Sequence, residues 1–316
     1  MPIKFLKKSI KGILRRCGYR LIRYNPPVIQ PVKEPGEKSP QDRSVPQARS
    51  ISIDGKKYQI SSAEDCKYLQ NIAISGVFEP ETVKLFTSLI DQDAYILDVG
   101  ANIGFTSILL GAHSRKVIGF EPSPTTYGFL ADNISRSGLN NIEAENYALG
   151  EEKGECELVA FPQHRSGASI STRIEATKGH IAEKIQVRTL DTVMSELDIP
   201  RIDFLKIDVE GFEKNVIEGG KGTIERFRPV VALELNHWCL NAFQRTSVPE
   251  FFDYLRSVFP VLLAVQGDRY LDLHINDESW AVMYRHILNF EFMNIVACFN
   301  LDQLENFFQL YQPEGS

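Results

Sequence analysis

The sequence predicts an α/β protein whose central, mainly parallel sheet is covered by helices on both faces. From residue 95 onward, strand-sized apolar runs alternate with segments of helical periodicity, which is the order that strand–helix–strand units produce. The runs at residues 96–99, 204–207 and 230–235 are apolar at most positions, as in strands buried on both faces. A chain of 316 residues, 43% of them hydrophobic, is long enough to bury such a sheet.

The expected elements follow one another in a regular order. Residues 51–60 predict a hairpin, because Asp54-Gly55 supplies the positive φ angles of a tight turn. Ser123 and Pro124 suit the first positions of a helix that ends at Gly138. The other expected helices cover residues 80–90, 103–112, 210–219 and 249–259, and the strands cover residues 95–99, 116–120, 142–148, 158–161, 185–188, 204–207, 230–235, 261–265, 270–274 and 294–299.

Residues 1–24 carry eight basic side chains and no acidic one. On a helix, one stripe of this segment collects the apolar residues Ile3, Leu6, Ile10, Ile13, Cys17 and Leu21. Such a basic amphipathic helix suits the surface of an anionic membrane; packing on the protein's own body and binding of a partner protein are the alternatives. Residues 25–50 are rich in proline and predict a disordered linker, so the folded domain is expected over residues 51–316.

Charge and cysteine usage exclude several classes of function. Beyond residue 24 the chain holds 27 basic and 41 acidic residues, which argues against a surface that binds nucleic acid. The five cysteines are scattered and lack C-x-x-C spacing, which favours a reducing compartment. No apolar run approaches the roughly 20 residues of a bilayer-spanning helix. We therefore expect a cytoplasmic protein, with peripheral contact at the inner membrane surface through residues 1–24.

The most informative segment is I-L-D-V-G-A-N-I-G-F at residues 96–105, where a strand passes through a glycine-rich turn into a helix. In a doubly wound sheet a nucleotide-like ligand binds at this place. Gly100 is expected to let the backbone approach the ligand, and Gly104 to let helix and strand pack closely. The dinucleotide pattern G-x-G-x-x-G is broken by Asn102 and Phe105, which favours a nucleoside ligand without phosphates.

Glu121 ends the second expected strand, 23 residues after Asp98. Doubly wound folds place at this position an acid that accepts hydrogen bonds from two ribose hydroxyls. The alternative is a surface glutamate whose charge is favoured by the dipole of the following helix.

Four segments resemble the FkbM family of S-adenosylmethionine-dependent methyltransferases: D-V-G-A-N-I-G-F (98–105), F-E-P-S-P (120–124), T-L-D-T-V (189–193) and F-L-K-I-D-V-E-G-F-E (204–213). The resemblance is strongest over residues 75–240. It implies a Rossmann-like class I methyltransferase sheet of seven strands, the last ones including an antiparallel pair. It also implies S-adenosylmethionine as the cofactor and a hydroxyl of a sugar, glycan or related natural product as the acceptor.

The resemblance also assigns residues to the methyl donor. The residues that it places at the donor are Asp98, Gly100, Ala101, Asn102, Gly104 and Glu121, with Asn146 and Ala148 beside the adenine.

The strand ending near residue 207 is expected to carry the catalytic groups. Asp208 and Glu210 emerge at its carboxyl end, beside the position of the transferred methyl group. A hydroxyl acceptor is a weak nucleophile, so either carboxylate is a candidate general base, and Lys206 is a third candidate catalytic residue. Two neighbouring acids can instead hold a divalent cation, or Asp208 can cap a helix and Glu210 can lie in its first turn.

Other residues at the same edge leave alternatives open. Glu234 and His237 follow the strand at residues 230–235 and are candidates for a second base or metal ligands. His164 and His180 lie in a polar insertion, residues 162–184, that is long enough to cover an acceptor. The alternative functions are a catalytically silent domain that binds a glycan or a membrane partner, and a nicotinamide-dependent oxidoreductase. Metal dependence and oligomeric state stay open.

Overall fold

A computed structural model of the protein describes residues 48–63, 66–161, 164–170, 181–197 and 199–315. The basic helix expected over residues 1–24 and nearly all of the expected linker lie outside these ranges. The first described element, strand β1, begins at Arg49, two residues before the expected start of the folded domain.

The strands are β1 (Arg49–Ile53), β2 (Lys56–Ile60), β3 (Tyr95–Val99), β4 (Lys116–Phe120), β5 (Ile142–Glu145), β6 (Ala148–Leu149), β7 (Gly154–Phe161), β8 (His164–Ile170), β9 (Ile181–Arg188), β10 (Phe204–Ile207), β11 (Val230–Glu234), β12 (Val261–Gln266), β13 (Arg269–Asp272), β14 (Asn294–Cys298) and β15 (Gln312–Pro313). The helices are α2 (Lys67–Ser75), α3 (Pro80–Ser88), α4 (Phe105–Ala112), α5 (Pro124–Ser137), α6 (Leu190–Val193), α7 (Glu213–Gly219), α8 (Lys221–Phe227), α9 (His237–Cys239), α10 (Val248–Val258), α11 (Asn276–Asn289) and α12 (Glu305–Leu310), with short η helices at Leu240–Gln244 and Leu301–Leu304.

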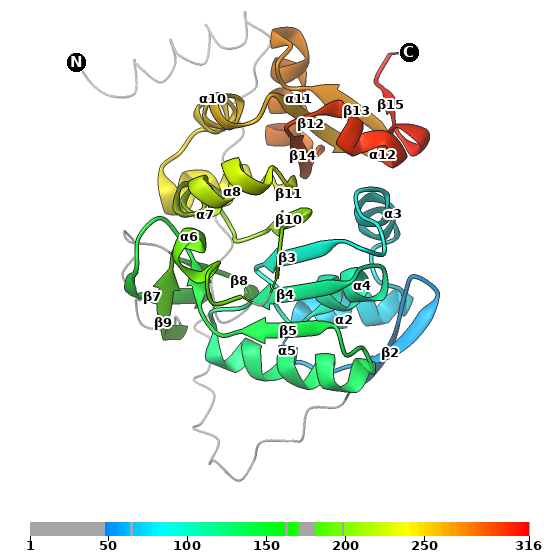
Figure 1. Cartoon of the computed structure of the whole chain (residues 1–316), viewed down its shortest axis with the longest axis vertical. Coiled ribbons are helices and arrows are strands. Elements are labelled where there is room, and N and C mark those ends of the chain that lie inside the picture. Colours follow the sequence, from blue (N-terminus) through cyan, green and yellow to red (C-terminus); the bar gives the residue numbers. More distant parts are fainter. Residues whose placement is uncertain (1–47, 64–65, 162–163, 171–180, 198, 316) are drawn as a thin grey trace, which may run out of the picture. The chain divides into compact units, whose positions relative to one another are not determined.

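The central sheet runs in the order β15-β13-β12-β14-β11-β10-β3-β4-β5 (Figure 1). Strands β11, β10, β3, β4 and β5 are parallel, whereas β14 is antiparallel to both β11 and β12. This arrangement confirms the doubly wound α/β class and the expected antiparallel pairing among the last strands. The described sheet has nine strands instead of seven, because β13 and β15 extend the edge beyond β12.

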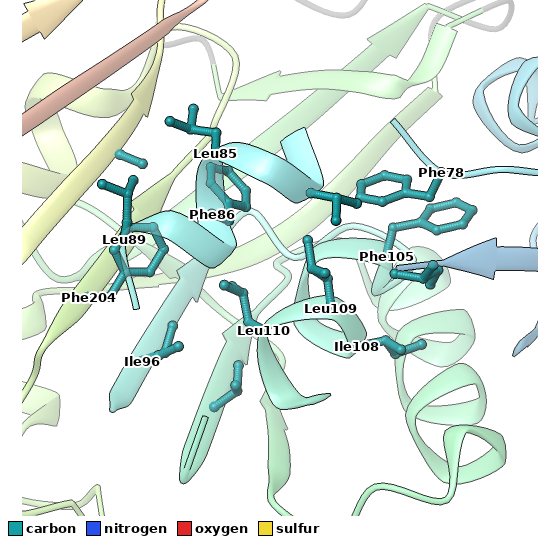
Figure 2. Close-up of a cluster of buried hydrophobic side chains, with 14 of the residues drawn as sticks. Phe78, Leu85, Phe86, Leu89, Ile96, Phe105, Ile108, Leu109, Leu110 and Phe204 are labelled. Carbon is teal, nitrogen blue, oxygen red and sulfur yellow. The ribbon is translucent and has the colours of Figure 1, made fainter. Parts of the chain in front are cut away.

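Hydrophobic cores cover both faces of the sheet, as the apolar strands predict. Alternate residues of a strand point to opposite faces, so Ile96 and Phe204 belong to one core and Leu97 and Leu205 to the other. Helices α3, α4 and α5 cover the first face, where the side chains of α3 and α4 pack over Ile96 and Phe204 (Figure 2). Helices α7, α8, α10 and α11 contribute to the second core.

One expected strand is divided between two sheets. The strand predicted over residues 142–148 leaves the central sheet after Glu145. Up to that residue it forms β5, which lies at the edge of the central sheet and pairs with β4 alone. Residues Ala148–Leu149 then form β6, which pairs with β9 in a separate sheet of order β6-β9-β7-β8. The expected strands at 158–161 and 185–188 are confirmed within β7 and β9, and part of the expected insertion is strand β8.

Most other elements agree with the sequence, but some helices differ. The hairpin at Asp54-Gly55, the Ser123 cap of α5 and the end of α5 at Gly138 are confirmed. The helix predicted from residue 210 begins at Glu213, since Glu210 and Gly211 have φ angles of 53° and 96°, which a helix does not accommodate. The sequence did not predict helices α2, α8 and α11.

Candidate active site

A cavity of about 850 Å³ lies at the carboxyl ends of the central strands. Its wall includes the turns that follow β3, β4 and β10 and the carboxyl end of β11, because parallel strands end at the same edge of a sheet. Leu158 of β7 and Ala148 of β6 bring the second sheet to the same cavity. From before β3, the described wall includes Tyr68, Phe78 and Glu79. This volume lies in the range of ligand sites.

The turn after β3 is held by backbone hydrogen bonds. The amides of Gly100 and Ala101 both donate to the carbonyl oxygen of Phe120, each over 3.0 Å. Gly100 has a φ of 82°, and a Cβ built there would lie 1.8 Å from the carbonyl oxygen of Asp208. The structure therefore shows a reason for glycine at position 100 that the sequence did not show. The backbone after β10 approaches this position too closely for any side chain.

Gly104 also has a role different from the expected one. It precedes α4 with a φ of 96°, and a Cβ there would meet Cδ1 of Leu130 at 2.8 Å. Leu130 belongs to α5, so the close packing that Gly104 permits is between two helices and not between a helix and a strand.

Glu121 lies in the cavity wall with a buried carboxyl group. Its Oε2 accepts from the amide of Asn102 over 3.0 Å, and its Oε1 accepts from the amide of Ser123 over 2.9 Å. Burial raises the pKa of Glu121 to about 7, against the opposing effect of the two amides. Because each carboxylate oxygen has two lone pairs, Glu121 keeps the capacity to accept from two further donors.

Three of the residues predicted at the donor, Asp98, Gly104 and Asn146, are not in the described cavity wall. Asp98 is fully buried and accepts from the hydroxyls of Thr106 over 2.8 Å and Ser107 over 2.6 Å. Asn146 donates from Nδ2 to the carbonyl oxygen of Glu121 over 2.9 Å. Both side chains thus support the turns around the cavity, whereas Ala101, Asn102, Gly100 and Ala148 line it directly.

Lys206 connects the two halves of the site. Its Nζ donates to the carbonyl oxygen of Gly100 over 2.8 Å and lies 3.1 Å from Oδ1 of Asp98 and 3.5 Å from Oδ2 of Asp208. Burial opposes the charge of this ammonium group, but Asp98 and Asp208 outweigh that effect and raise the pKa of Lys206 above its ordinary value. A lysine that stays protonated can pair with the two carboxylates and hold the Gly100 carbonyl in place, but it cannot accept a proton.

Three carboxyl groups gather at the ends of β10 and β11. Asp208 has a side chain that is 43% exposed, whereas the Glu210 carboxyl accepts from the Cys239 thiol over 3.0 Å and from Asn236 Nδ2 over 3.3 Å. Glu234, the last residue of β11, lines the cavity with these two acids. Burial, and then the charge of Asp208, raise the pKa of both Glu210 and Glu234. Of the three, Asp208 is the group most open to the cavity.

Sequence reasoning assigned no role to two further groups. Glu213 is buried, and its Oε1 accepts from the amides of Val209 over 3.3 Å and Gly211 over 3.0 Å, which holds the loop that carries Asp208 and Glu210. Tyr68 donates its hydroxyl to Glu79 over 3.1 Å. Glu213 is the last residue of the segment at residues 204–213 that resembles the FkbM family, so this motif was a signal for it. Tyr68 precedes residues 75–240, where the resemblance is strongest, and no motif pointed to it.

Of the two candidates for a second base or metal ligands, Glu234 and His237, the described cavity wall contains Glu234 alone. The His237 ring packs against His286 and Phe290 with centroid distances of 5.0 and 4.7 Å. Burial lowers the pKa of His237. The side chains of His164 and His180 lie outside the described residues.

The described part of the chain holds neither a candidate metal centre nor a membrane-spanning helix. No group of three or more His, Cys, Asp and Glu side chains within it has the arrangement of a metal centre. None of its helices has the length and apolar character needed to cross a bilayer.

Comparison with known proteins identifies the family. The family model of the Methyltransferase FkbM domain matches residues 98–270. Methyltransferase 1 of Beauveria bassiana is 26% identical over 40% of this chain and 59% of its own length, so the match spans little more than half of that relative. Hexuronic acid methyltransferase AglP of Haloferax volcanii is 24% identical, over 59% of this chain and 73% of its own.

A further enzyme and a crystal structure are also similar to this chain. The 2-O-methyltransferase NoeI of Sinorhizobium fredii is 27% identical over 45% of this chain and 63% of its own. The crystal structure of the methyltransferase FkbM from Methylobacillus flagellatus KT is 20% identical with a TM-score of 0.39, over 54% of this chain and 39% of its own. Since the family match spans more than half of the 316 residues, the expected relationship is confirmed, and the chain belongs to the family of FkbM methyltransferase domains.

Proposed function

We propose that the protein is an S-adenosylmethionine-dependent O-methyltransferase whose acceptor is a hydroxyl of a sugar, glycan or related natural product. The observation that carries this proposal is one cavity with two different carboxylates. Glu121 is buried and keeps hydrogen-bonding capacity for a ribose, whereas Asp208 is half-exposed and lies beside a fixed ammonium group.

The residues of the donor end fit S-adenosylmethionine. When bound, this cofactor supplies an electrophilic methyl group. Glu121 is placed to accept from both ribose hydroxyls, and the apolar Phe120, Ala148 and Leu158 offer contact to the faces of an adenine. The backbone of residues 100–102 forms the adjoining wall, as the sequence predicted for this turn.

Asp208 is the general base in this proposal. The O–H bond of the acceptor breaks as the oxygen is methylated, and its proton passes to the Asp208 carboxylate. Glu210 and Glu234 are less suited to accept that proton first, because burial raises the pKa of both and favours the neutral acid. Lys206 positions Asp208 through their 3.5 Å ion pair.

The charges of the cavity wall favour a neutral acceptor. The described wall contains the acids Glu79, Glu81, Glu121, Asp208, Glu210 and Glu234. Lys206 is the basic side chain among the described lining residues, and it is already paired with Asp98 and Asp208. An acceptor with a carboxylate would meet this acidic wall, whereas sugar hydroxyls can donate to it. One relative is named a hexuronic acid methyltransferase and another a 2-O-methyltransferase; the wall favours the hydroxyl chemistry of the latter.

A paired assay tests the proposal. The protein is incubated with S-adenosylmethionine and either a neutral hexoside or the matching hexuronide, and S-adenosylhomocysteine formation is followed. We expect the neutral sugar to be methylated with at least about tenfold higher kcat/KM, which corresponds to about 1.4 kcal/mol of discrimination. Preference for the hexuronide would contradict the proposed acceptor class. Binding of S-adenosylmethionine without turnover of any hydroxyl acceptor would favour the silent binding domain.

The sequence of residues 1–24 supports a second proposal, that this segment binds anionic membrane surfaces. The intact protein should co-sediment with vesicles that contain phosphatidylserine, and less of it should do so as salt is raised, because salt screens the attraction of headgroups for basic side chains. Charge reversal at Lys7, Lys8, Arg15 and Arg16 should release it. An intact protein that ignores such vesicles at low salt would contradict this proposal.

A further inference from the structure

Helix α11 has a buried side and, opposite to it, an exposed apolar side. Its inner side buries Ser279, Val282 and His286. Its outer side exposes Trp280, Tyr284, Ile287 and Leu288, whose spacing of four, three and one residues places them on one face of a helix. The exposed fractions of Trp280 and Tyr284 are 71% and 66%. A surface helix normally presents polar residues on this side, so the outer face needs another explanation.

Two more exposed apolar residues adjoin the ends of the helix. Ile275 immediately precedes α11 and Phe290 immediately follows it. The Phe290 ring packs against His237 and His286, on the buried side of the helix, so we name the four residues that share one helical face, Trp280, Tyr284, Ile287 and Leu288, the α11 face. None of them belongs to the described wall of the cavity, so a contact on this face leaves the carboxyl edge of the sheet open.

The exposed area of the α11 face lies near the upper end of the range for a monomer. A fully exposed aromatic side chain offers roughly 150–250 Å², so the four partly exposed side chains together present on the order of 500 Å². The largest apolar patch of a typical monomer covers about 300–600 Å². A stable complex of standard size buries about 800 Å² on each partner, and somewhat more than half of that area is apolar. The α11 face therefore has about the apolar area that one side of a dimer interface needs.

We propose that the α11 face is the two-fold interface between two copies of this chain. A two-fold axis brings the same surface patch of both copies together, so one apolar face satisfies both partners. When the axis is perpendicular to the helix, the two α11 helices run antiparallel and each N-terminus faces its partner's C-terminus, a favourable arrangement of helix dipoles.

Charges near the face disfavour an anionic membrane as the occupant. Asp277 and Glu278 lie in the first turn of α11, and Glu291 follows Phe290. Arg285, in the last turns of the helix, is paired with both Glu291 and Glu314. An anionic lipid surface would thus meet acidic groups at both ends of the face, whereas a second copy buries the apolar residues between them.

The test measures the molar mass of the full-length protein in solution. Light scattering or sedimentation equilibrium across the micromolar range should give the mass of a dimer. Tyr284→Glu should give a monomer, because two charges would be buried opposite one another near the axis. A second variant, Trp280→Ala with Leu288→Ala, adds no charge and should raise the dissociation constant at least about tenfold.

Ile74→Glu is the matched control. Ile74 of α2 is 86% exposed and apolar but is not part of the α11 face, so this variant should remain a dimer. A monomeric wild-type protein would overturn the proposal, as would a dimer that persists in Tyr284→Glu or one that Ile74→Glu dissociates equally. A monomer that binds neutral phosphatidylcholine vesicles, and loses this binding in Tyr284→Glu, would assign the face to a lipid surface and overturn the dimer.

Discussion

The proposed donor end and the proposed acceptor end of the cavity are built from different kinds of chemical group. At the donor end, backbone groups dominate: the amides of Gly100 and Ala101 bind the Phe120 carbonyl, and the amides of Asn102 and Ser123 bind Glu121. At the acceptor end, side-chain acids dominate, since Asp208, Glu210 and Glu234 lie on two adjacent turns.

In the proposed function, one edge of the sheet binds the cofactor at one place and carries out proton transfer at another. A turn shaped by backbone hydrogen bonds presents a rigid surface whose form changes little with pH. At the acceptor end, burial and the charge of Asp208 raise the pKa values of Glu210 and Glu234, so the charge of this group of acids depends on pH. Lys206 joins the two ends by contacting Gly100 and Asp208 together.

The largest effect is expected from a substitution that disables the acceptor end alone. Asp208→Asn should reduce turnover about 10²–10⁴-fold, the usual contribution of a general base, and leave S-adenosylmethionine binding nearly unchanged. Single-turnover kinetics and calorimetry measure the two effects separately. Glu210→Gln is the matched control and should lose less, because burial already favours its neutral form. Wild-type turnover in Asp208→Asn would refute the base, and activity abolished by chelator and restored by Mg²⁺ would reassign these carboxylates as ligands.

A smaller effect is expected at the donor end. Glu121→Ala should weaken donor binding by about 1.5–3 kcal/mol, the range for hydrogen bonds to a charged group, and Glu121→Gln should weaken it less. Since burial raises the pKa of Glu121 to about 7, wild-type affinity should rise as the pH increases through 7 and the carboxylate forms. Calorimetric titration on both sides of this pH measures the trend. A pH dependence that survives in Glu121→Gln would mean that another group causes it.

The last expected effect concerns stability and not activity, and it lies in the loop between the two ends. Burial raises the pKa of Glu213 from 4.5 to about 7, so between these values the folded protein keeps a proton that the unfolded chain has lost. The corresponding stabilisation is complete below the unfolded value and falls by up to about 1.4 kcal/mol per pH unit as the pH approaches 7. Glu213→Gln mimics the protonated acid and should flatten this part of the unfolding free energy against pH. Identical slopes in urea denaturation of the two proteins would contradict the assignment.

The sequence by itself predicted the features that depend on neighbouring residues. Asp54-Gly55 specifies a tight turn, Ser123-Pro124 begins α5 and Gly138 ends it, because the relevant backbone angles and caps are local. The segment at residues 98–105 predicted the turn that lines the cavity, and the four recognised segments predicted the family. All of these signals lie within a few consecutive residues.

Only the tertiary structure decided the features that join distant parts of the chain. It placed Lys206 between Asp98 and Asp208, packed His237 against His286, moved residues 148–149 into a second sheet and left the α11 face exposed. Burial, charge pairing and the closeness of Gly100 to the Asp208 backbone are properties of groups far apart in sequence. Hydrophobic periodicity reports which face of an element is apolar, but not which partner covers it, and desolvation acts only once that partner is in place.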